Sequence, residues 1–68
     1  MYNVIEYDKH INEGTGFKFH TSDLVEIERK VLPFNEEKVM FKIYAPEGEY
    51  TIQNHDDLQS FISEAKGL

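Results

Sequence analysis

Cysteine is absent from the 68-residue chain, and no long apolar run interrupts its polar residues. Without cysteine the chain has neither disulfides nor thiolate metal ligands, which excludes a disulfide-built secreted scaffold. No apolar stretch approaches the roughly 18 residues that a membrane-spanning helix needs. Residues 1–10 also lack the basic start and the apolar stretch of a signal peptide. We therefore expect a cytoplasmic protein without a membrane partner.

Basic residues are scarce as well. Seven lysines and arginines stand against 13 aspartates and glutamates, so the net charge is −6 and the sequence pI is about 4.8. A phosphate backbone attracts clustered lysine and arginine, so we expect no nucleic-acid partner. The acidity has two interpretations. It keeps a small domain soluble, or it recognises a basic surface on another protein, in the sharpest version by mimicking the charge of DNA.

The length allows one domain, residues 1–68, with a small core. A core of this size contributes only about 3–5 kcal/mol unless a metal or a partner chain adds to it. Hydrophobic residues make up 40% of the chain and aromatic residues 13%, which is enough for a folded chain and argues against disorder.

Motifs that bind nucleotides or metals are missing. Gly14-Thr15-Gly16 lacks the third glycine of a dinucleotide-binding loop, because Phe19 stands at that position, and no Gly-Lys-Ser/Thr follows. The three histidines are scattered and lack the close spacing of a zinc site; they are His10, His20 and His55. We therefore expect neither a cofactor nor a bound metal.

Residue sets for catalysis are missing too. Nucleophilic catalysis requires a nucleophile, a base and an orienting group. The serines fall in a predicted turn or helix, and no base or orienting group is recognisable beside them. The adjacent carboxylates at 36–37 and 56–57 fall in a turn and at a helix start, where water solvates them. The chain is also short for an enclosed pocket of hundreds of Å³. We expect no enzymatic activity.

The first third of the chain is predicted to form a β-hairpin. Residues from Tyr2 to Ile11 are rich in β-branched and aromatic side chains, which favours a strand. Two glycines within residues 12–16 mark a turn that needs positive φ. Residues 17–20 then alternate between apolar and polar, which places Phe17 and Phe19 on one face of the second strand.

Residues 22–32 fit two patterns. In a helix the apolar positions 24, 27 and 31 share one face, and Asp23 with Glu26 can form a capping box. In a strand Val25, Ile27 and Val31 share one face. The restricted side-chain torsions of the three β-branched residues favour the strand. Proline at position 33 ends either element.

The segment from Val39 to Ala45 gives the clearest strand pattern, with the odd-numbered side chains on one face and Met40, Lys42 and Tyr44 on the other. Residues 46–49 contain the proline and glycine of a turn, and the chain returns through residues 50–52. A four-residue loop keeps the apolar faces in phase, whereas a three-residue loop does not. We therefore predict that Ala45 pairs with Tyr50 and that residue 43 pairs with residue 52.

The last segment has the pattern of a helix. Asn54 is a natural N-cap, and the aspartates at 56 and 57 lie in the first turn, where the helix dipole favours negative charge. Four apolar residues then form one stripe: Leu58, Phe61, Ile62 and Ala65. Gly67 follows as a C-terminal cap. A helix of this length needs a sheet to pack against.

These elements predict an α+β fold, in which one C-terminal helix packs on a small antiparallel sheet of about four or five strands. The alternative turns residues 22–32 into a second helix and gives the order ββαββα. By exclusion, the predicted function is that of a small acidic protein that binds and modulates another protein with a basic surface. A host-modulating inhibitor encoded by a phage or mobile element, active in host takeover, is an example. The alternative is a structural homo-oligomer subunit with no separate ligand, so the protein is a monomer or a homodimer.

The candidate partner-binding surface lies on and around residues 39–45. Met40 and Tyr44 form its apolar centre, because both residue types are enriched at protein interfaces, and Phe34 is a further candidate for this face. The alternative is that the N-terminal hairpin packs on this face and covers it. The carboxylates of the two flanking turns form an acidic rim at its ends: Glu36, Glu37, Glu47 and Glu49. Reversing the charge at positions 36 and 37 is expected to slow association with little loss of fold stability.

Overall fold

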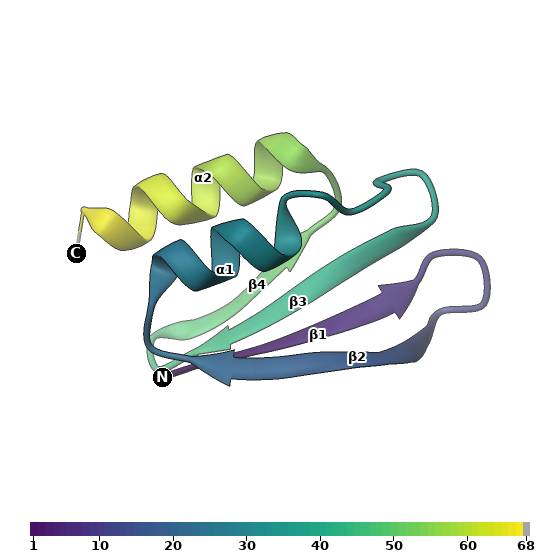
Figure 1. The fold of residues 1–68 in the computed structure, drawn as a ribbon, viewed down its shortest axis with the longest axis horizontal. Helices are drawn as coiled ribbons and strands as arrows, with labels where there is room; N and C mark the ends of the chain where they lie inside the picture. Colours follow the sequence, from purple (N-terminus) through teal and green to yellow (C-terminus); the bar gives the residue numbers. More distant parts are fainter. Residues whose placement is uncertain (68) are drawn as a thin grey trace.

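The computed structural model describes residues 1–67 as two β-hairpins, each followed by a helix (Figure 1). The bounds are β1 Tyr2–Asp8, β2 Glu13–Thr21, α1 Leu24–Val31, β3 Val39–Ala45, β4 Gly48–Ile52 and α2 His55–Lys66. The four strands form one antiparallel sheet in the order β2-β1-β3-β4. The α+β class and the sheet packed by the C-terminal helix are confirmed, and of the two predicted arrangements the chain adopts ββαββα.

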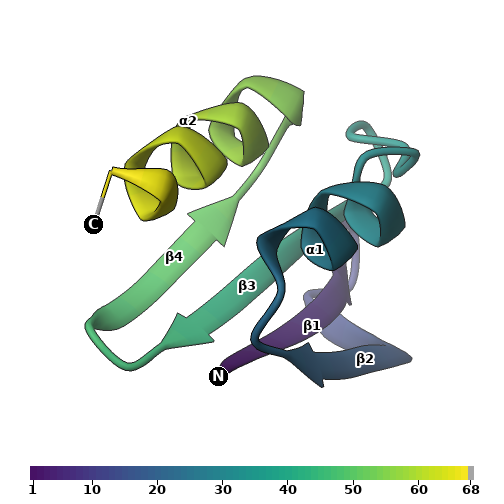
Figure 2. The same ribbon diagram turned by 60° about the vertical axis from the view of Figure 1, so that its left-hand side comes forward.

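Both helices cover the same face of the sheet, α1 on the side of β2 and α2 on the side of β4 (Figures 1 and 2). The core lies between them and that face, and its buried side chains are Val4, Ile27, Val31, Phe34, Phe41, Ile43, Ile52, Leu58, Phe61 and Ile62. No described element packs against the other face. Neither helix in residues 1–67 is long and apolar enough to cross a membrane.

The strand prediction for residues 22–32 is wrong, because α1 occupies residues 24–31. The Asp23 side chain caps α1 by accepting a hydrogen bond from the Val25 N–H at 2.9 Å. The helix buries Ile27 and Val31 completely and leaves Val25 63% exposed. A strand would bury all three on one face, whereas the helical spacing buries only the two that reach the core. The Glu26 carboxylate lies 3.0 Å from the Lys30 ammonium instead of completing a capping box.

The turn of the first hairpin precedes the glycines that were expected to form it. Residues 9–12 connect β1 to β2, and Asn12 takes the positive φ of 57°. The glycines lie within β2, where the pairing with β1 shifts between Ile5 and Tyr7, so that residues 15–17 face Glu6 alone. Gly16, with φ of 99°, accommodates this bulge.

The second hairpin is two residues tighter than predicted. Ala45 pairs with Gly48, and residue 43 pairs with Tyr50, so only residues 46 and 47 form the loop. The predicted register, with Ala45 opposite Tyr50, is therefore wrong. Loops of two and four residues place the same side chains on the same faces, because the side-chain period is two. Gly48, with φ of 152°, adopts the conformation that this tight return requires.

The prediction for the C-terminal helix is confirmed in its cap and in its buried stripe. The Asn54 side chain accepts a hydrogen bond from the Asp57 N–H at 2.8 Å. The stripe packs on the helix-covered face, where the Phe61 ring meets Tyr50 and Tyr2 edge to face at centroid distances of 4.8 and 5.8 Å. Gly67 is the C-cap residue.

Candidate functional site

The first candidate surface is the sheet face that neither helix covers, which we call the open face. Side chains alternate along each strand, so the neighbours of the core residues point to this side. They are Asn3, Ile5, Tyr7, Lys18, His20, Met40, Lys42, Tyr44, Glu49 and Thr51. The larger ones on the two central strands are half-buried although no element of residues 1–67 covers them, because they lie against one another.

Polar contacts connect the centre of the open face. The Lys42 ammonium lies 5.8 Å from the centre of the Tyr7 ring and 3.6 Å from the Glu49 carboxylate on β4. A hydrogen bond with the Tyr7 hydroxyl, followed by partial desolvation, raises the pKa of Tyr44 above its ordinary value. The two tyrosines therefore present an amphipathic surface, with apolar rings and polar hydroxyl groups, at the centre of the open face.

The structure brings together three of the six predicted binding residues. Met40 and Tyr44 lie on the open face of β3, and Glu49 lies beside them on β4. The carboxylate of Glu47 instead accepts a hydrogen bond from the Tyr50 hydroxyl at 3.1 Å, on the helix-covered side. Desolvation and this bond raise the pKa of Tyr50. Glu37 is exposed in the turn before β3.

Glu36 connects the turn before β3 to the start of α2. Its carboxylate accepts a hydrogen bond from the His55 backbone N–H at 2.8 Å and lies 3.0 Å from the His55 ring Nδ1. The other ring nitrogen, Nε2, lies 3.0 Å from the Phe34 carbonyl oxygen. The geometry therefore gives Glu36 a structural contact at a helix N-terminus, which the sequence pattern did not reveal, so the expected small effect on stability applies to position 37 and not to position 36.

Phe34 was a candidate for the face that carries Met40 and Tyr44, but it lies on the opposite side of the sheet, under the helices. The residue is 8% exposed, and its ring packs edge to face on Phe41 at 5.3 Å and on His55 at 4.8 Å. The turn after α1 directs the ring into the core under the helices, so Phe34 is not part of the open face.

We expect Glu36→Ala to destabilise the fold by about 1 kcal/mol, because the substitution removes an acceptor for an N–H at the start of α2. The ring contact is half-exposed and adds little to this value. Urea unfolding measures the difference. Glu37→Ala is the matched control and is expected to change stability by less than about 0.5 kcal/mol. Equal effects of the two substitutions would contradict the structural role of Glu36.

The histidines lie in separate places. His20 lies on the open face of β2, His10 lies in the first hairpin turn, and His55 opens α2. Within residues 1–67 no group of three or more histidine, aspartate or glutamate side chains is placed to hold a metal ion.

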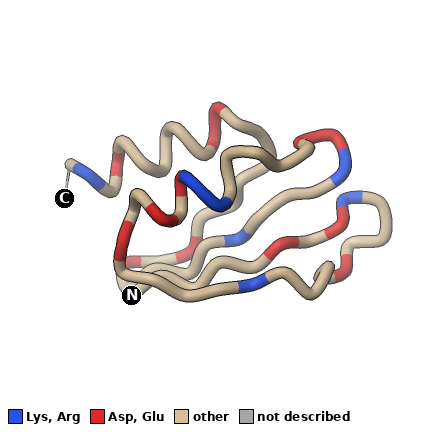
Figure 3. Tube along the Cα trace, viewed as in Figure 1, with Lys and Arg blue, Asp and Glu red and all other residues tan. Residues whose placement is uncertain are grey.

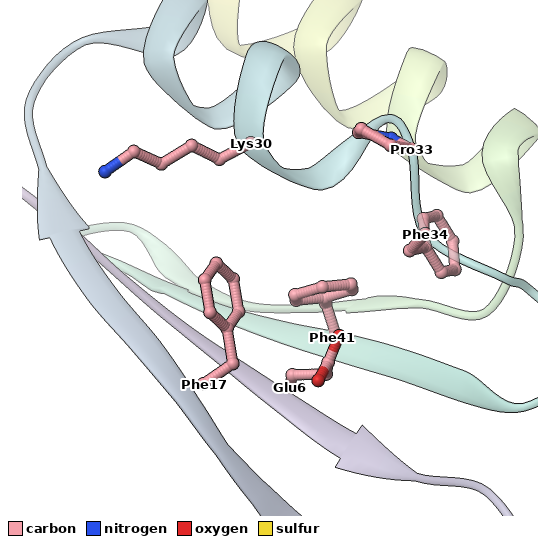
Figure 4. Close-up of a pocket in the computed structure, with 6 residues that line it drawn as sticks. All are labelled: Glu6, Phe17, Lys30, Pro33, Phe34 and Phe41. Atoms are coloured by element: carbon pink, nitrogen blue, oxygen red, sulfur yellow. The ribbon is translucent and has the colours of Figure 1, made fainter.

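The second candidate surface is an open groove under the C-terminal end of α1, which we call the aromatic groove (Figure 4). Its volume is about 310 Å³, and its lining residues come from β1, β2, α1, the turn after α1, and β3: Glu6, Phe17, Lys30, Pro33, Phe34 and Phe41. The Phe17 and Phe41 side chains rise from the sheet toward α1 (Figure 4). Their rings are perpendicular, with centroids 6.2 Å apart.

Lys30 contributes its methylene stem to the aromatic groove. Its ammonium points away from Glu6 (Figure 4), lies 4.8 Å above the Phe19 ring and pairs with Glu26. Hydrogen bonds from Thr21 and from Lys30 hold the pKa of Glu26 below its ordinary value. The charge of Lys30 is thus balanced outside the groove, which leaves Glu6 as the charged group inside it.

Sequence reasoning missed this groove, although it predicted that Phe17 and Phe19 share a face. One signal was present: Glu6 follows Tyr2 and Val4 at the alternating positions that point toward the core.

Comparison with protein-family models, curated proteins and solved structures found no match. The two surfaces are therefore interpreted from their own residues.

Charge is spread unevenly between the two faces of the sheet. Acidic residues occupy both helices and the turns, and some also lie on the strands (Figure 3). The open face carries two lysines and one glutamate: Lys18, Lys42 and Glu49. The net charge of −6 therefore arises outside the open face. The acidic rim expected around Met40 and Tyr44 is represented on this face by Glu49 alone.

Proposed function

We propose that this protein is non-catalytic and acts by binding another protein through its open face. One observation carries the proposal: among residues 1–67 nothing covers a sheet face whose centre consists of Ile5, Tyr7, Met40 and Tyr44 around the side chain of Lys42. Tyrosine and methionine are enriched at protein interfaces, because they combine a large apolar area with adaptable or polar tips.

The arrangement of the open face supports a docking role. The four large side chains lie with Lys42 on β1 and β3, the two inner strands, and polar side chains of the edge strands flank them. A mainly apolar centre within a polar rim is the usual layout of an interface. The Lys42–Glu49 pair is exposed enough to be weak in water, so both groups are free to pair with charges of a partner.

The partner in this proposal is a protein with a basic surface. A net charge of −6 on 68 residues produces a negative field that attracts a basic protein over about 10 Å at moderate salt. The open face itself carries two lysines and one glutamate, so the negative field comes from the helices and turns and acts on the rate of encounter, while the tyrosines act on the lifetime of the complex. Inhibition is the most direct form of modulation, since a bound protein blocks the surface that it covers.

We expect Tyr44→Ala to shorten the lifetime of the complex at least tenfold, as loss of a central interface residue does. The immobilised protein is used to capture ligands from a cell lysate at low and high salt, beside Ser63→Ala, a control on the exposed side of α2. A basic protein should be retained by the wild type and by Ser63→Ala, be lost with Tyr44→Ala, and dissociate at high salt. An identical set of captured proteins on all three would refute the open face as the binding surface.

Light scattering distinguishes the proposal from the homo-oligomer alternative. We expect the mass of a monomer, about 8.0 kDa, at micromolar concentration. A dimer that Tyr44→Ala converts to a monomer would show that a second copy of the chain covers the open face. That result would replace the proposed function with a structural one.

A further inference from the structure

The aromatic groove contains a carboxylate at a position where the sheet pattern calls for an apolar residue. Glu6 lies on the inner strand β1, faces the helices and pairs with Phe41 in the sheet. Its side chain accepts a hydrogen bond from the Thr15 hydroxyl across the bulge. No lysine, arginine or histidine of residues 1–67 forms an ion pair with it. Glu6 is half-buried as a residue, whereas the carboxylate that accepts this bond is exposed, so a cation can reach it from solvent beside the aromatic rings.

Phe17 gives the groove a ring that is open to a cation. It stands at 86° to Phe41, which like Phe34 is almost fully buried and contributes an apolar wall. The face of an aromatic ring carries negative charge density and attracts a cation within about 6 Å of its centre. Phe17 remains 42% exposed and is the most accessible of the three rings.

The chain itself already uses this interaction next to the groove. The Lys30 ammonium lies over the ring of Phe19, the strand neighbour of Phe17. Because Lys30 is held there and pairs with Glu26, it does not reach Glu6. Only its apolar stem lines the groove, where it can pack against the stem of another long side chain.

We propose that the aromatic groove binds a lysine or arginine side chain of a basic partner protein. The rings and the Lys30 stem hold the methylenes, and the Glu6 carboxylate pairs with the ammonium or guanidinium group. Charge complementarity selects this occupant. An anion would be repelled by the Glu6 carboxylate and by the net charge of −6. A purely apolar side chain would leave the carboxylate without a partner. The proposal goes beyond the proposed function, because it concerns a second surface.

The test uses NMR titration of the ¹⁵N-labelled protein with three blocked tripeptides, in which lysine, arginine or norleucine stands between two alanines. We expect the lysine and arginine peptides to shift the amides of Glu6, Gly16 and Phe17 in a saturable way with millimolar affinity. The norleucine peptide has a stem of similar length but no charge, and we expect no saturable shift up to about 20 mM.

Two variants and a matched control complete the test. Glu6→Gln keeps an oxygen acceptor for Thr15 and is expected to weaken lysine binding about five- to tenfold. Glu13→Gln removes an equal charge from an exposed position on β2 and is expected to change binding less than twofold. Phe17→Leu removes an exposed ring and keeps an apolar side chain, so it should weaken binding even if Glu6→Gln fails to fold.

Three outcomes would overturn the proposal: equal binding of norleucine and lysine peptides, equal effects of Glu6→Gln and Glu13→Gln, or no saturable shift with any peptide. The titration needs no natural partner and does not involve Tyr44. Failure of the aromatic groove and failure of the open face are therefore separate results.

Discussion

Replacing Phe61 by alanine is expected to leave the protein largely unfolded at room temperature. The Phe61 side chain is 2% exposed, and its ring packs between Tyr2 of β1 and Tyr50 of β4. Truncating a buried phenylalanine costs about 3–5 kcal/mol, from lost burial and from the cavity that remains. A core of this size contributes only about 3–5 kcal/mol in total, so this loss exhausts the stability.

Circular dichroism during thermal and urea unfolding measures the effect. Ser60→Ala, one residue earlier on the exposed side of α2, is the control and should stay within about 0.5 kcal/mol of the wild type. A cooperative transition of Phe61→Ala close to that of the wild type would show that α2 does not contribute to the core as the structure indicates.

The C-terminal half of the fold was predictable because local and long-range requirements agree there. Asn54 caps α2, the apolar stripe has helical spacing, and β3 alternates strictly, so each signal selects the structure that also buries the most apolar surface. The register of the second hairpin was not predictable from alternation. Loops of two and four residues bury the same faces, and only the backbone conformation at Gly48 separates them.

The turn of the N-terminal hairpin was not predictable for a different reason. Two glycines within three residues are a strong turn signal, yet Asn12 supplies the positive φ of the turn and Gly16 supplies that of a bulge. Asparagine and glycine both tolerate positive φ, so a turn at either position is compatible with the local sequence. The choice between them depends on pairing of β1 with β3 on its other side, which the local sequence does not encode.

The residues of the candidate surfaces were likewise predictable only where the pattern of a single strand determines their position. Met40 and Tyr44 could be assigned to a shared face because alternation within one strand determines it. The directions of Glu36 and Glu47 depend on partners elsewhere, the start of α2 and the Tyr50 hydroxyl. The aromatic groove requires five segments to come together, so it becomes visible only in the folded chain.

The preference for a strand at residues 22–32 failed because it rested on intrinsic propensity, which is weaker than burial. β-branched residues disfavour a helix by only a few tenths of a kcal/mol each. Burying Ile27 and Val31 between α1 and the sheet contributes about 1.5–3 kcal/mol for each side chain. The helical spacing of these residues, with Asp23 ahead of them, was the stronger signal.

Two substitutions in α1 measure how much burial in the helix contributes to stability. Ile27→Ala is expected to destabilise the protein by about 2–5 kcal/mol, because Ile27 is fully buried. Val25→Ala is expected to change stability by less than about 0.5 kcal/mol, because Val25 is 63% exposed and alanine is the better helix former. Urea unfolding gives both values. A strand places positions 25 and 27 on the same face, so comparable losses for the two variants would restore the strand and remove α1, together with the Lys30 stem that lines the aromatic groove.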